Sequence, residues 1–289
     1  MSLQKITFLG LGAMGYPMAG YLTENYQVTV YNRTTEKAEK WVNEYSGEMA
    51  ETPEESVKHA DVIITCVGND NDVRDIYAKI FSAAKPGALL IDHTTTSSIL
   101  ARELYQQAKE KDMEFLDAPV SGGQAGAEQG ILTIMVGGDQ ATFDKALDIM
   151  NSYAKATTLI GESGKGQSLK MVNQLCITGI LQGLSEAWSM AKASDIDAKM
   201  MVDVLQHGAA GSWQMVNRTE TAMNNEFDFG FAIDWMRKDL AICFEEAEKL
   251  GIDLPLARQV DEKYAKLQQR GYSRADTSVL FKQFDEESR

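Results

Sequence analysis

The first half of the chain consists of short apolar runs separated by amphipathic stretches. The runs are rich in β-branched residues and are bounded by Gly, Asp or Asn, as buried strands are. Between them, stretches such as 34–45 and 97–112 have the period of a helix. Strands that alternate with helices at this spacing predict a parallel sheet covered on both faces. The expected strands lie at 5–10, 27–32, 61–67, 88–92, 114–118, 132–138 and 156–161.

The pattern changes after about residue 162, where the strand signals stop. The run 166–194 is apolar around most of its circumference and predicts one long helix, buried on several sides. We therefore expect an α/β domain at 1–162 and an all-helical domain at 163–289, joined by this long helix. Further helices are expected near 197–207, 212–225, 232–250, 256–270 and 276–286, with turn signals such as Gly251 and Pro255 between them.

Composition and charge limit the classes of partner. The hydrophobic fraction of 44% over 289 residues allows two domains with sizeable cores. The formal net charge of −14 disfavours binding to nucleic acid, whose phosphates need a basic surface. No apolar run reaches the roughly 18 residues of a membrane-spanning helix, and glycines interrupt the apolar N-terminal stretch. We therefore expect a cytoplasmic protein without a nucleic-acid or membrane partner.

The cysteines and histidines give no sign of a metal site. Cys66, Cys176 and Cys243 are far apart and lie among apolar residues, so we expect buried, reduced thiols. No CxxC pair occurs and the three histidines are isolated, which predicts that no metal is bound. The acidic end FDEESR is expected to fray.

A glycine motif directly follows the first expected strand and opens a helix. In Gly10-x-Gly12-x-x-Gly15, the first glycine allows a tight turn and the second allows close approach of a pyrophosphate. The third lets helix and strand pack closely, with the helix N-terminus facing the phosphates. This context indicates a Rossmann-type dinucleotide-binding domain, and a glycine-rich turn without a ligand is the alternative. The expected cofactor contacts are Gly10, Leu11, Gly12, Ala13, Met14 and Gly15.

The end of the second expected strand bears on the choice between NAD and NADP. NAD enzymes usually place an acid there to accept hydrogen bonds from the ribose hydroxyls. This chain has Asn32, Arg33 and Thr34 instead, with no acid before Glu36. Arg33 can pair with a 2′-phosphate, and its two neighbours can hydrogen-bond to that phosphate. We therefore expect NADP, with NAD as the alternative cofactor and an ordinary exposed arginine as the alternative role.

Two further segments carry candidate chemistry. In the stretch DAPVSGG, Ser121, Gly122 and Gly123 offer a hydroxyl and consecutive N–H groups to a carboxylate. Lys170 and Asn173 are three residues apart at the start of the long helix, so both lie on one face. The helix dipole disfavours a cation near a helix start, so Lys170 at this place indicates a functional reason.

Other side chains are weaker candidates. Arg218 and Arg237 could help to hold a carboxylate, although solvated or salt-bridged arginines are commoner. Aromatic residues on helices usually belong to the core, but five could line a substrate pocket, namely Trp213, Phe227, Phe229, Phe231 and Trp235.

The sequence resembles the β-hydroxyacid dehydrogenase family, which contains 3-hydroxyisobutyrate dehydrogenase, tartronate semialdehyde reductase and glyoxylate/succinic semialdehyde reductase. The resemblance rests on GLGAMGYPMA at 10–19, DAPVSGG at 117–123, GKGQSLKMVNQ at 164–174 and KDL at 238–240. These motifs occur in the family's order and span nearly the whole chain.

The resemblance implies roles for the site residues. Lys170 would be catalytic, and Asn173 would orient the substrate. Some relatives place an asparagine one position later, where this chain has Gln174, so Gln174 is the alternative amide. Ser121, Gly122 and Gly123 would bind the substrate carboxylate. The remaining cofactor-binding candidates are Val67, Thr95 and Lys238.

The expected function is hydride transfer between NADP and a small β-hydroxyacid or its semialdehyde, in a homodimer or homotetramer. Lys170 would be the general base in oxidation and the general acid in reduction. A 3-hydroxyisobutyrate dehydrogenase-like activity is the first expectation, and glyoxylate/succinic semialdehyde or tartronate semialdehyde reduction with the same site is the alternative.

Two other classes of protein fit less well. A non-catalytic dinucleotide-binding protein would not require Lys170 and Asn173 on one helical face. A decarboxylating sugar-phosphate dehydrogenase shares the early motifs, but the second half of this chain is short for that family's larger helical domain.

Overall fold

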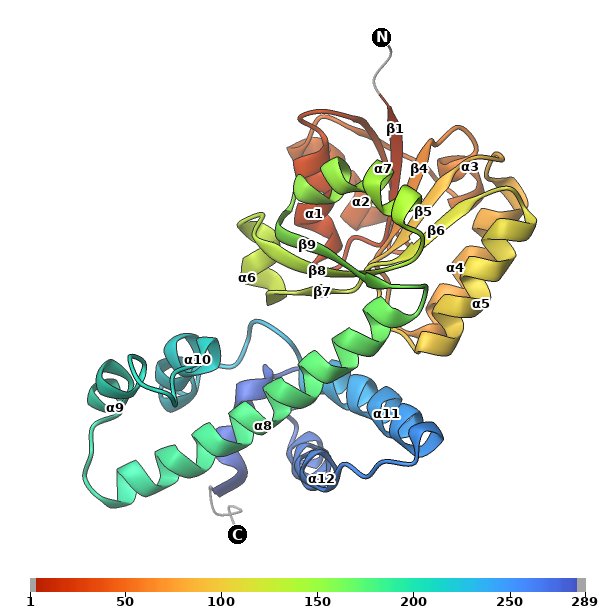
Figure 1. The fold of residues 1–289 in the computed structure, drawn as a ribbon. Coiled ribbons are helices and arrows are strands. Elements are labelled where there is room, and N and C mark those ends of the chain that lie inside the picture. Colours follow the sequence, from red (N-terminus) through yellow and green to blue (C-terminus); the bar gives the residue numbers. More distant parts are fainter. Residues whose placement is uncertain (1–3, 285–289) are drawn as a thin grey trace. The chain divides into compact units, whose positions relative to one another are not determined.

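The computed structural model describes residues 4–284, which divide into two compact units between Lys170 and Met171. The acidic residues expected to fray lie outside the described range, as do the last two residues of the expected final helix. The sheet unit comes first in the chain and the helical unit second (Figure 1).

Nine strands of the described residues form one sheet in the first unit. The strand order is β3-β2-β1-β4-β5-β6-β8-β7, and β9 pairs with β8. The pairs from β3 through to β6 are parallel, as the alternating pattern predicts. The strands are β1 (Lys5–Leu9), β2 (Gln27–Tyr31), β3 (Glu48–Met49), β4 (Val62–Thr65), β5 (Leu89–Asp92), β6 (Glu114–Asp117), β7 (Val120–Ser121), β8 (Leu132–Gly137) and β9 (Ala154–Gly161).

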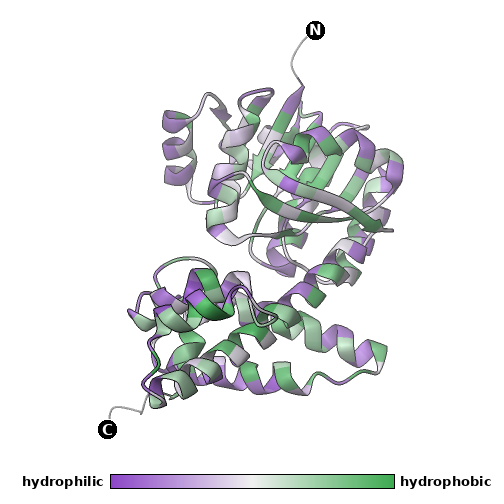
Figure 2. Cartoon of the chain, turned by 60° about the vertical axis from the view of Figure 1, so that its left-hand side comes forward, coloured by the Kyte–Doolittle hydropathy of each residue, from purple (hydrophilic) through white to green (hydrophobic). Residues whose placement is uncertain are grey.

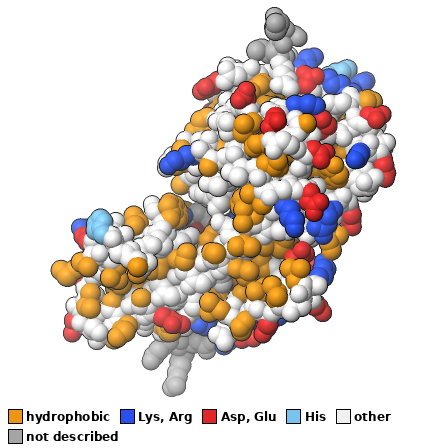
Figure 3. All heavy atoms as spheres, viewed as in Figure 1, with side chains coloured by type: hydrophobic (Ala, Val, Ile, Leu, Met, Phe, Trp, Pro, Cys, Tyr) orange, Lys and Arg blue, Asp and Glu red, His pale blue; other side chains and the backbone are white. Residues whose placement is uncertain are grey.

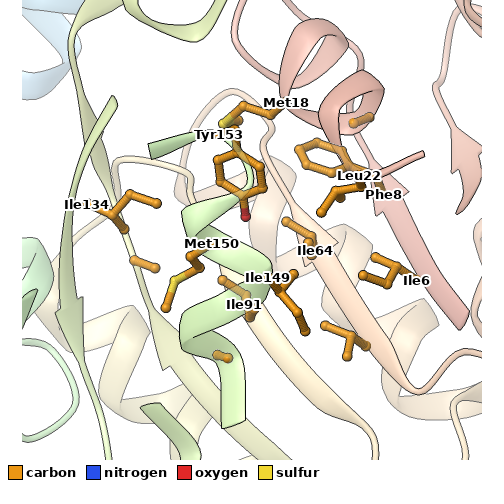
Figure 4. Close-up of a cluster of buried hydrophobic side chains, with 14 of the residues drawn as sticks. Ile6, Phe8, Met18, Leu22, Ile64, Ile91, Ile134, Ile149, Met150 and Tyr153 are labelled. Carbon is orange, nitrogen blue, oxygen red and sulfur yellow. The ribbon is translucent and has the colours of Figure 1, made fainter. Parts of the chain in front are cut away.

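Helices cover both faces of this sheet, and successive residues of each central strand serve opposite faces. Ile64 in β4 packs with one set of helices, whereas its neighbour Ile63 packs with the other. Figure 4 shows side chains of α1 and α7, including Met18 and Ile149, meeting those of β1, β4 and β5 in one of the two cores. The helices are α1 (Gly15–Leu22), α2 (Thr35–Glu44), α3 (Pro53–Val57), α4 (Asp70–Ala83), α5 (Ser98–Glu110), α6 (Gly123–Glu128) and α7 (Gln140–Asn151).

The far edge of the sheet departs from the all-parallel expectation. β8 runs antiparallel to β6 and β7, because α6 and its flanking turns connect β7 to β8 directly and reverse the chain. The stretch between Ser121 and Gly130 thus contains a short helix, although its glycine content is typical of a loop. Gly126 lies buried within α6, whereas Gly130 adopts a φ of 67° just after that helix.

The second half of the described chain is helical, as expected, and has a core of its own. The helix α11 ends at Gly251 in the left-handed conformation, and Pro255 starts α12. Figure 2 shows apolar and polar residues mixed along these helices, as in helices with one buried side. The elements are α8 (Lys165–Ala193), α9 (Ala198–Leu205), α10 (Trp213–Met223), α11 (Ile233–Leu250), α12 (Pro255–Gln269) and a 3₁₀ helix, η1 (Thr277–Phe284), in place of the last expected α-helix.

The prediction of three buried cysteines is wrong for Cys176, which is exposed, and Cys66 is only partly buried. Cys176 lies on the same outward side of α8 as Val172 and Ile180, at a spacing of four residues. An apolar sequence environment therefore indicated burial where the folded single chain leaves one side of α8 uncovered. No helix among residues 4–284 is long and apolar enough to cross a membrane.

Candidate active site

The three glycines of the motif after β1 have different surroundings. Gly10 has a φ of 103°, and a Cβ there would lie 2.3 Å from the carbonyl oxygen of Cys66. A Cβ at Gly15 would lie 2.0 Å from the carbonyl oxygen of Gly10. A Cβ at Gly12, in contrast, would meet no atom within 4 Å. Protein packing thus explains the first and third glycines, whereas the open side of the second fits the approach of a pyrophosphate.

Asn32 holds this turn in place. Its Oδ1 accepts a hydrogen bond from the backbone N–H of Leu11 at 2.8 Å, and its Nδ2 donates to the carbonyl oxygen of Thr34 at 2.9 Å. The side chain therefore links the glycine-rich turn to the end of β2. Ala13 is exposed and Met14 is half-buried beside Gly12, so this side of the turn remains accessible.

Arg33 and Thr34 lie on the surface next to that turn. The Arg33 side chain is 89% exposed and lies 3.5 Å from a carboxylate oxygen of Asp72 in α4. Thr34 is the N-cap residue of α2, but its hydroxyl makes no capping hydrogen bond. The region thus combines an extended cation with a neighbouring carboxylate. A 2′-phosphate bound to Arg33 would lie close to this carboxylate and would be repelled by it.

The loops after β4 and β5 are bonded to each other. The backbone N–H of Val67 donates to Oγ1 of Thr94 at 3.0 Å, and the N–H of Thr94 donates to Oδ1 of Asp92 at 3.1 Å. Thr65 donates to the same Asp92 oxygen at 2.8 Å. Burial raises the pKa of Asp92 to about 6, although the hydrogen bonds from Thr94 and Thr65 lower it.

Thr95 is half-buried in the loop after β5. Because β1, β4 and β5 are neighbouring parallel strands, the glycine-rich turn, Val67 and Thr95 share the carboxyl edge of the sheet. Ligands of open α/β sheets bind at this edge, which fits a dinucleotide along these three loops.

The substrate-loop candidates lie just beyond β6. Ser121 ends β7, and Gly122 and Gly123 follow with φ values of 133° and 63°. Two consecutive left-handed residues favour glycine strongly, because a Cβ would strain both positions. A Cβ at Gly122 would also lie 3.0 Å from the Leu132 side chain.

The first turn of α8 is anchored to β6 by a buried carboxylate. Asp117 accepts hydrogen bonds from the N–H of Gly164 at 2.7 Å and of Gln167 at 3.0 Å, and from the Ser163 hydroxyl at 3.2 Å. Burial raises the pKa of Asp117 to about 6, although these donors favour the ionised form. The carboxylate thus occupies the positive end of α8 and satisfies N–H groups that the helix itself leaves unpaired.

Lys170 lies in the second turn of α8 and is 7% exposed, which makes it the one buried lysine among the described residues. Burying an ammonium group is costly, so chains rarely retain it without a functional or electrostatic reason. Gln167, one turn earlier on the same face, is fully buried and bonds to the loop around Thr95.

The amides that follow Lys170 are linked to α11. Asn173 donates to Oε1 of Gln174 at 2.8 Å, and Gln174 donates to Oδ2 of the buried Asp239 at 2.6 Å. The other carboxylate oxygen of Asp239 lies 2.9 Å from Nζ of Lys238. Two predicted site residues, Gln174 and Lys238, therefore contact one carboxylate, and Asn173 is linked to it through Gln174. Asp239 belongs to the sequence motif KDL, in which the resemblance assigns a role to the lysine alone.

The sheet unit thus holds most of the predicted cofactor residues together with Ser121, Gly122, Gly123 and Lys170. Asn173, Gln174 and Lys238 belong to the helical unit. No group of three or more His, Cys, Asp or Glu side chains among residues 4–284 is arranged to hold a metal ion.

The two weaker arginine candidates have structural partners. Arg237 pairs with Asp261 at 2.8 Å, and Arg218 lies 3.3 Å from the buried Asp276. Arg218 is also stacked between the rings of Trp213 and Phe229. These contacts confirm the salt-bridged interpretation for both arginines, and Phe227 and Phe231 pack in or against the core of the helical unit.

Comparisons with known proteins agree with this arrangement. Residues 5–161 match the family model of the NAD binding domain of 6-phosphogluconate dehydrogenase. Residues 164–284 match that of the NAD-binding domain of NADP-dependent 3-hydroxyisobutyrate dehydrogenase.

Individual relatives match over almost the full length. An uncharacterized oxidoreductase of Shewanella frigidimarina is 48% identical, over 96% of this chain and 97% of its own. The NAD-dependent L-serine dehydrogenase of Pseudomonas aeruginosa is 30% identical, over 98% of both chains.

A solved structure of 3-hydroxyisobutyrate dehydrogenase from Mycobacterium tuberculosis with L-serine has the same fold. It superimposes with a TM-score of 0.88 at 30% identity, over 99% of this chain and 100% of its own. The described geometry and these matches together show that the chain belongs to the β-hydroxyacid dehydrogenase family, whose members are NAD(P)-dependent enzymes that act on hydroxyacids.

Proposed function

We propose that this protein is an NADP-dependent oxidoreductase of a small β-hydroxyacid, with Lys170 as its general acid and base. The observation that carries the proposal is the burial of this one lysine in the second turn of α8. A solvated lysine stays protonated at neutral pH, whereas burial in general disfavours the charged ammonium form and so favours the neutral amine.

The proposed chemistry needs a proton to move with each hydride. A bound nicotinamide dinucleotide supplies or accepts the hydride. In reduction, the Lys170 ammonium donates a proton to the carbonyl oxygen of the substrate, and in oxidation the neutral amine removes it from the hydroxyl. Asn173, which is fixed through Gln174 and Asp239, orients the reacting oxygen.

In the proposed β-hydroxyacid substrate, one carbon separates the carboxylate from the carbon that bears the reacting hydroxyl. Ser121 and the left-handed pair Gly122 and Gly123 offer a hydroxyl and backbone N–H groups to that carboxylate. The relatives named for 3-hydroxyisobutyrate and L-serine support this class, because both compounds are 3-hydroxypropanoates, substituted at C2 by a methyl or an amino group. A semialdehyde or glyoxylate reductase with the same residues is the second candidate, because a preference for NADP favours the reductive direction.

NADP is proposed because Arg33 extends into solvent beside the glycine-rich turn and no carboxylate ends β2. Asn32 contributes indirectly in this proposal, by holding the Leu11 amide and the backbone of Thr34. Asp72 should weaken the binding of a 2′-phosphate, because its carboxylate lies 3.5 Å from the guanidinium group of Arg33 and would repel the phosphate. The Arg33–Asp72 pair is therefore the proposed determinant of cofactor preference.

A substrate panel with NADPH and with NADH tests the function. It contains glyoxylate, succinic semialdehyde and tartronate semialdehyde for reduction, and 3-hydroxyisobutyrate and L-serine for oxidation. We expect higher kcat/KM with the NADP cofactors, and a loss of roughly 10- to 100-fold for NADPH alone in Arg33→Ala, the usual value of a charge-assisted hydrogen bond. Asp72→Asn is the matched variant and should improve NADPH use. Faster turnover with NADH in the unaltered protein would contradict the cofactor proposal.

The protein is further proposed to act as a homodimer or homotetramer. Large apolar side chains remain exposed on the helical unit, and Figure 3 shows many hydrophobic side chains on its visible face. They include Val172, Ile180 and Met190 on α8, with exposed fractions of 53%, 38% and 75%. Exposed apolar surfaces of this extent usually mark protein contacts, and a second copy is the proposed partner.

A further inference from the structure

Gln167 has every polar group of its side chain bonded to the loop after β5. Its Nε2 donates to the carbonyl oxygen of Thr94 at 2.7 Å, and its Oε1 accepts from the backbone N–H of Thr96 at 3.0 Å. The residue is fully buried. These two backbone groups flank Thr95, so a single carboxamide fixes the chain on both sides of that residue.

The bonding pattern is specific to a carboxamide. A side chain at this position must present one donor and one acceptor, side by side, to a carbonyl and an N–H of the same loop. An ionised carboxylate lacks the donor, and an apolar side chain of the same length lacks both. A Gln that only filled space would not need this pairing.

The backbone of Gln167 is fixed as firmly as its side chain. Its N–H donates to Oδ2 of Asp117, whose Oδ1 accepts from Gly164 at the start of α8. Glycines stand where any side chain would collide with this carboxylate. A Cβ at Gly137 would lie 2.6 Å from Asp117 Oδ1, and one at Gly166 would lie 2.8 Å from Asp117 Oδ2. The first turn of α8 therefore cannot slide along β6 without breaking these bonds.

Lys170 follows Gln167 by three residues, which is just under one helical turn and a rise of about 4.5 Å. The same part of α8 thus carries Lys170, the proposed proton donor, and Gln167, which hydrogen-bonds to the backbone on both sides of Thr95. The loop is also held from its other side, because Val67 donates to Thr94 Oγ1 at 3.0 Å.

We propose that Gln167 is a positioning residue for hydride transfer, which sets the place of Lys170 relative to the proposed cofactor-binding loop at Thr95 without touching the substrate. The inference rests on the proposed function, since it assumes that Lys170 moves the proton. Misplacing a catalytic group by about 1 Å costs roughly 100-fold in rate, so loss of this clamp should appear mainly in kcat.

The test compares Gln167→Met and Gln167→Glu with Gln182→Met and Lys170→Met in the full-length protein. Gln182 is a matched control, because it is a buried glutamine of the same helix that bonds to Glu186 and to no cofactor loop. For each variant we would measure kcat, KM, NADPH binding, the fraction folded in urea, and the isotope effect with NADPH deuterated at the transferred position.

We expect Gln167→Met to lower kcat by roughly 10- to 100-fold, with less than a threefold change in substrate KM, and to raise the isotope effect as hydride transfer becomes limiting. Gln182→Met should match the unaltered protein in these three values. In Gln167→Glu, protonation restores a donor beside the acceptor. Its activity relative to the unaltered protein should therefore rise as the pH falls, even if the Met variant does not fold.

Each contrary outcome has a distinct meaning. Unaltered kcat and isotope effect in Gln167→Met overturn the positioning role, as does a Gln167→Glu activity ratio that is independent of pH. If Lys170→Met is inactive in either case, the proposed function stands and only this inference fails. If Lys170→Met retains the full rate, the acid–base proposal fails and the inference fails with it.

Discussion

At the scale of single residues, Gly12 differs from the other two glycines of the nucleotide turn. Its substitution should affect ligand binding without affecting the packing of the fold. Gly10 and Gly15 lack side chains because neighbouring backbone atoms fill the space, at 2.3 and 2.0 Å from their would-be Cβ atoms. Gly12 has no such neighbour within 4 Å and no left-handed φ. Within residues 4–284, no neighbouring atom of the protein demands a glycine there, which agrees with the proposed approach of a pyrophosphate at this position.

Gly12→Ala should therefore leave the free energy of unfolding within about 1 kcal/mol of the unaltered value, the ordinary range for Gly-to-Ala changes. The same variant should lose most of its NADPH affinity, because the methyl group occupies the approach of the pyrophosphate. Urea unfolding and fluorescence titration with NADPH measure the two effects. Gly15→Ala is the contrasting control and should be strongly destabilised. Unchanged NADPH affinity in Gly12→Ala would argue against a dinucleotide at this turn.

The sequence was a good guide to which residue types matter, but not to their partners. The motif spacing selected Lys170, Asn173 and the three glycines. It could not identify Asp239 or Asp117, whose bonds join residues 65 and 47 positions apart in the chain. Such contacts depend on how elements pack, and a single sequence carries no periodicity for them.

At the scale of elements, the ends of β5 and β9 are joined by a buried histidine. Nδ1 of His93 lies 2.6 Å from the carbonyl oxygen of Ala118, and Nε2 lies 2.9 Å from the Tyr153 hydroxyl. Burial lowers the pKa of His93 to about 4, in spite of the bond to Ala118. The imidazole is therefore neutral in the folded protein at pH values where the unfolded chain would already bind a proton.

This difference predicts a pH effect of defined sign. Between about pH 6.5 and pH 4 the unfolded state binds more protons at His93, so its contribution to stability falls as the pH falls. Asp92 and Asp117, whose pKa values burial raises to about 6, act in the opposite direction over nearly the same range. A comparison of variants is needed to separate the two effects.

His93→Gln should be less stable than the unaltered protein at pH 7, and that deficit should shrink by about 2 kcal/mol at pH 5, because only the unaltered protein loses the histidine contribution. Urea unfolding at both pH values measures the deficit. Tyr153→Phe keeps the histidine and should retain the pH dependence. A deficit of equal size at both pH values would show that His93 does not titrate between the folded and unfolded states as described.

The order of elements was largely predictable, because apolar runs and helical periods are local features. All seven expected strands occur, but the direction of β8 was missed. Its reversal depends on α6, a short helix in a glycine-rich stretch whose composition indicates a loop. The burial of α8 was also overestimated at Cys176, since periodicity shows that a face is apolar but not what covers it.

At the scale of the whole molecule, exposed apolar residues are unevenly distributed between the units. In the described sheet unit the large exposed hydrophobic side chains are Ile131 and Ile160, whereas the helical unit exposes many, from Val172 on α8 to Leu256 on α12. A second copy packed against the helical unit would remove this surface from water, which is the main favourable term in most association between proteins.

Ile180→Glu should accordingly shift the protein to a smaller assembly, because a carboxylate would enter an apolar interface. Ile160→Glu is the matched control, since both isoleucines are 38% exposed. Light scattering after size-exclusion chromatography gives the masses directly. An unaltered protein that is monomeric at micromolar concentration, or an Ile180→Glu variant with unchanged mass, would refute the proposed interface.

The central proposal is that Lys170 moves the proton in a hydride transfer from NADPH. It is tested most directly by single-turnover oxidation of bound NADPH in Lys170→Met, with the best substrate of the panel. We predict a rate lower by about 10²- to 10⁴-fold, the usual contribution of a general acid, with NADPH binding nearly unchanged. A rate within a few fold of the unaltered protein would contradict the assignment of Lys170 and, with it, the proposed mechanism.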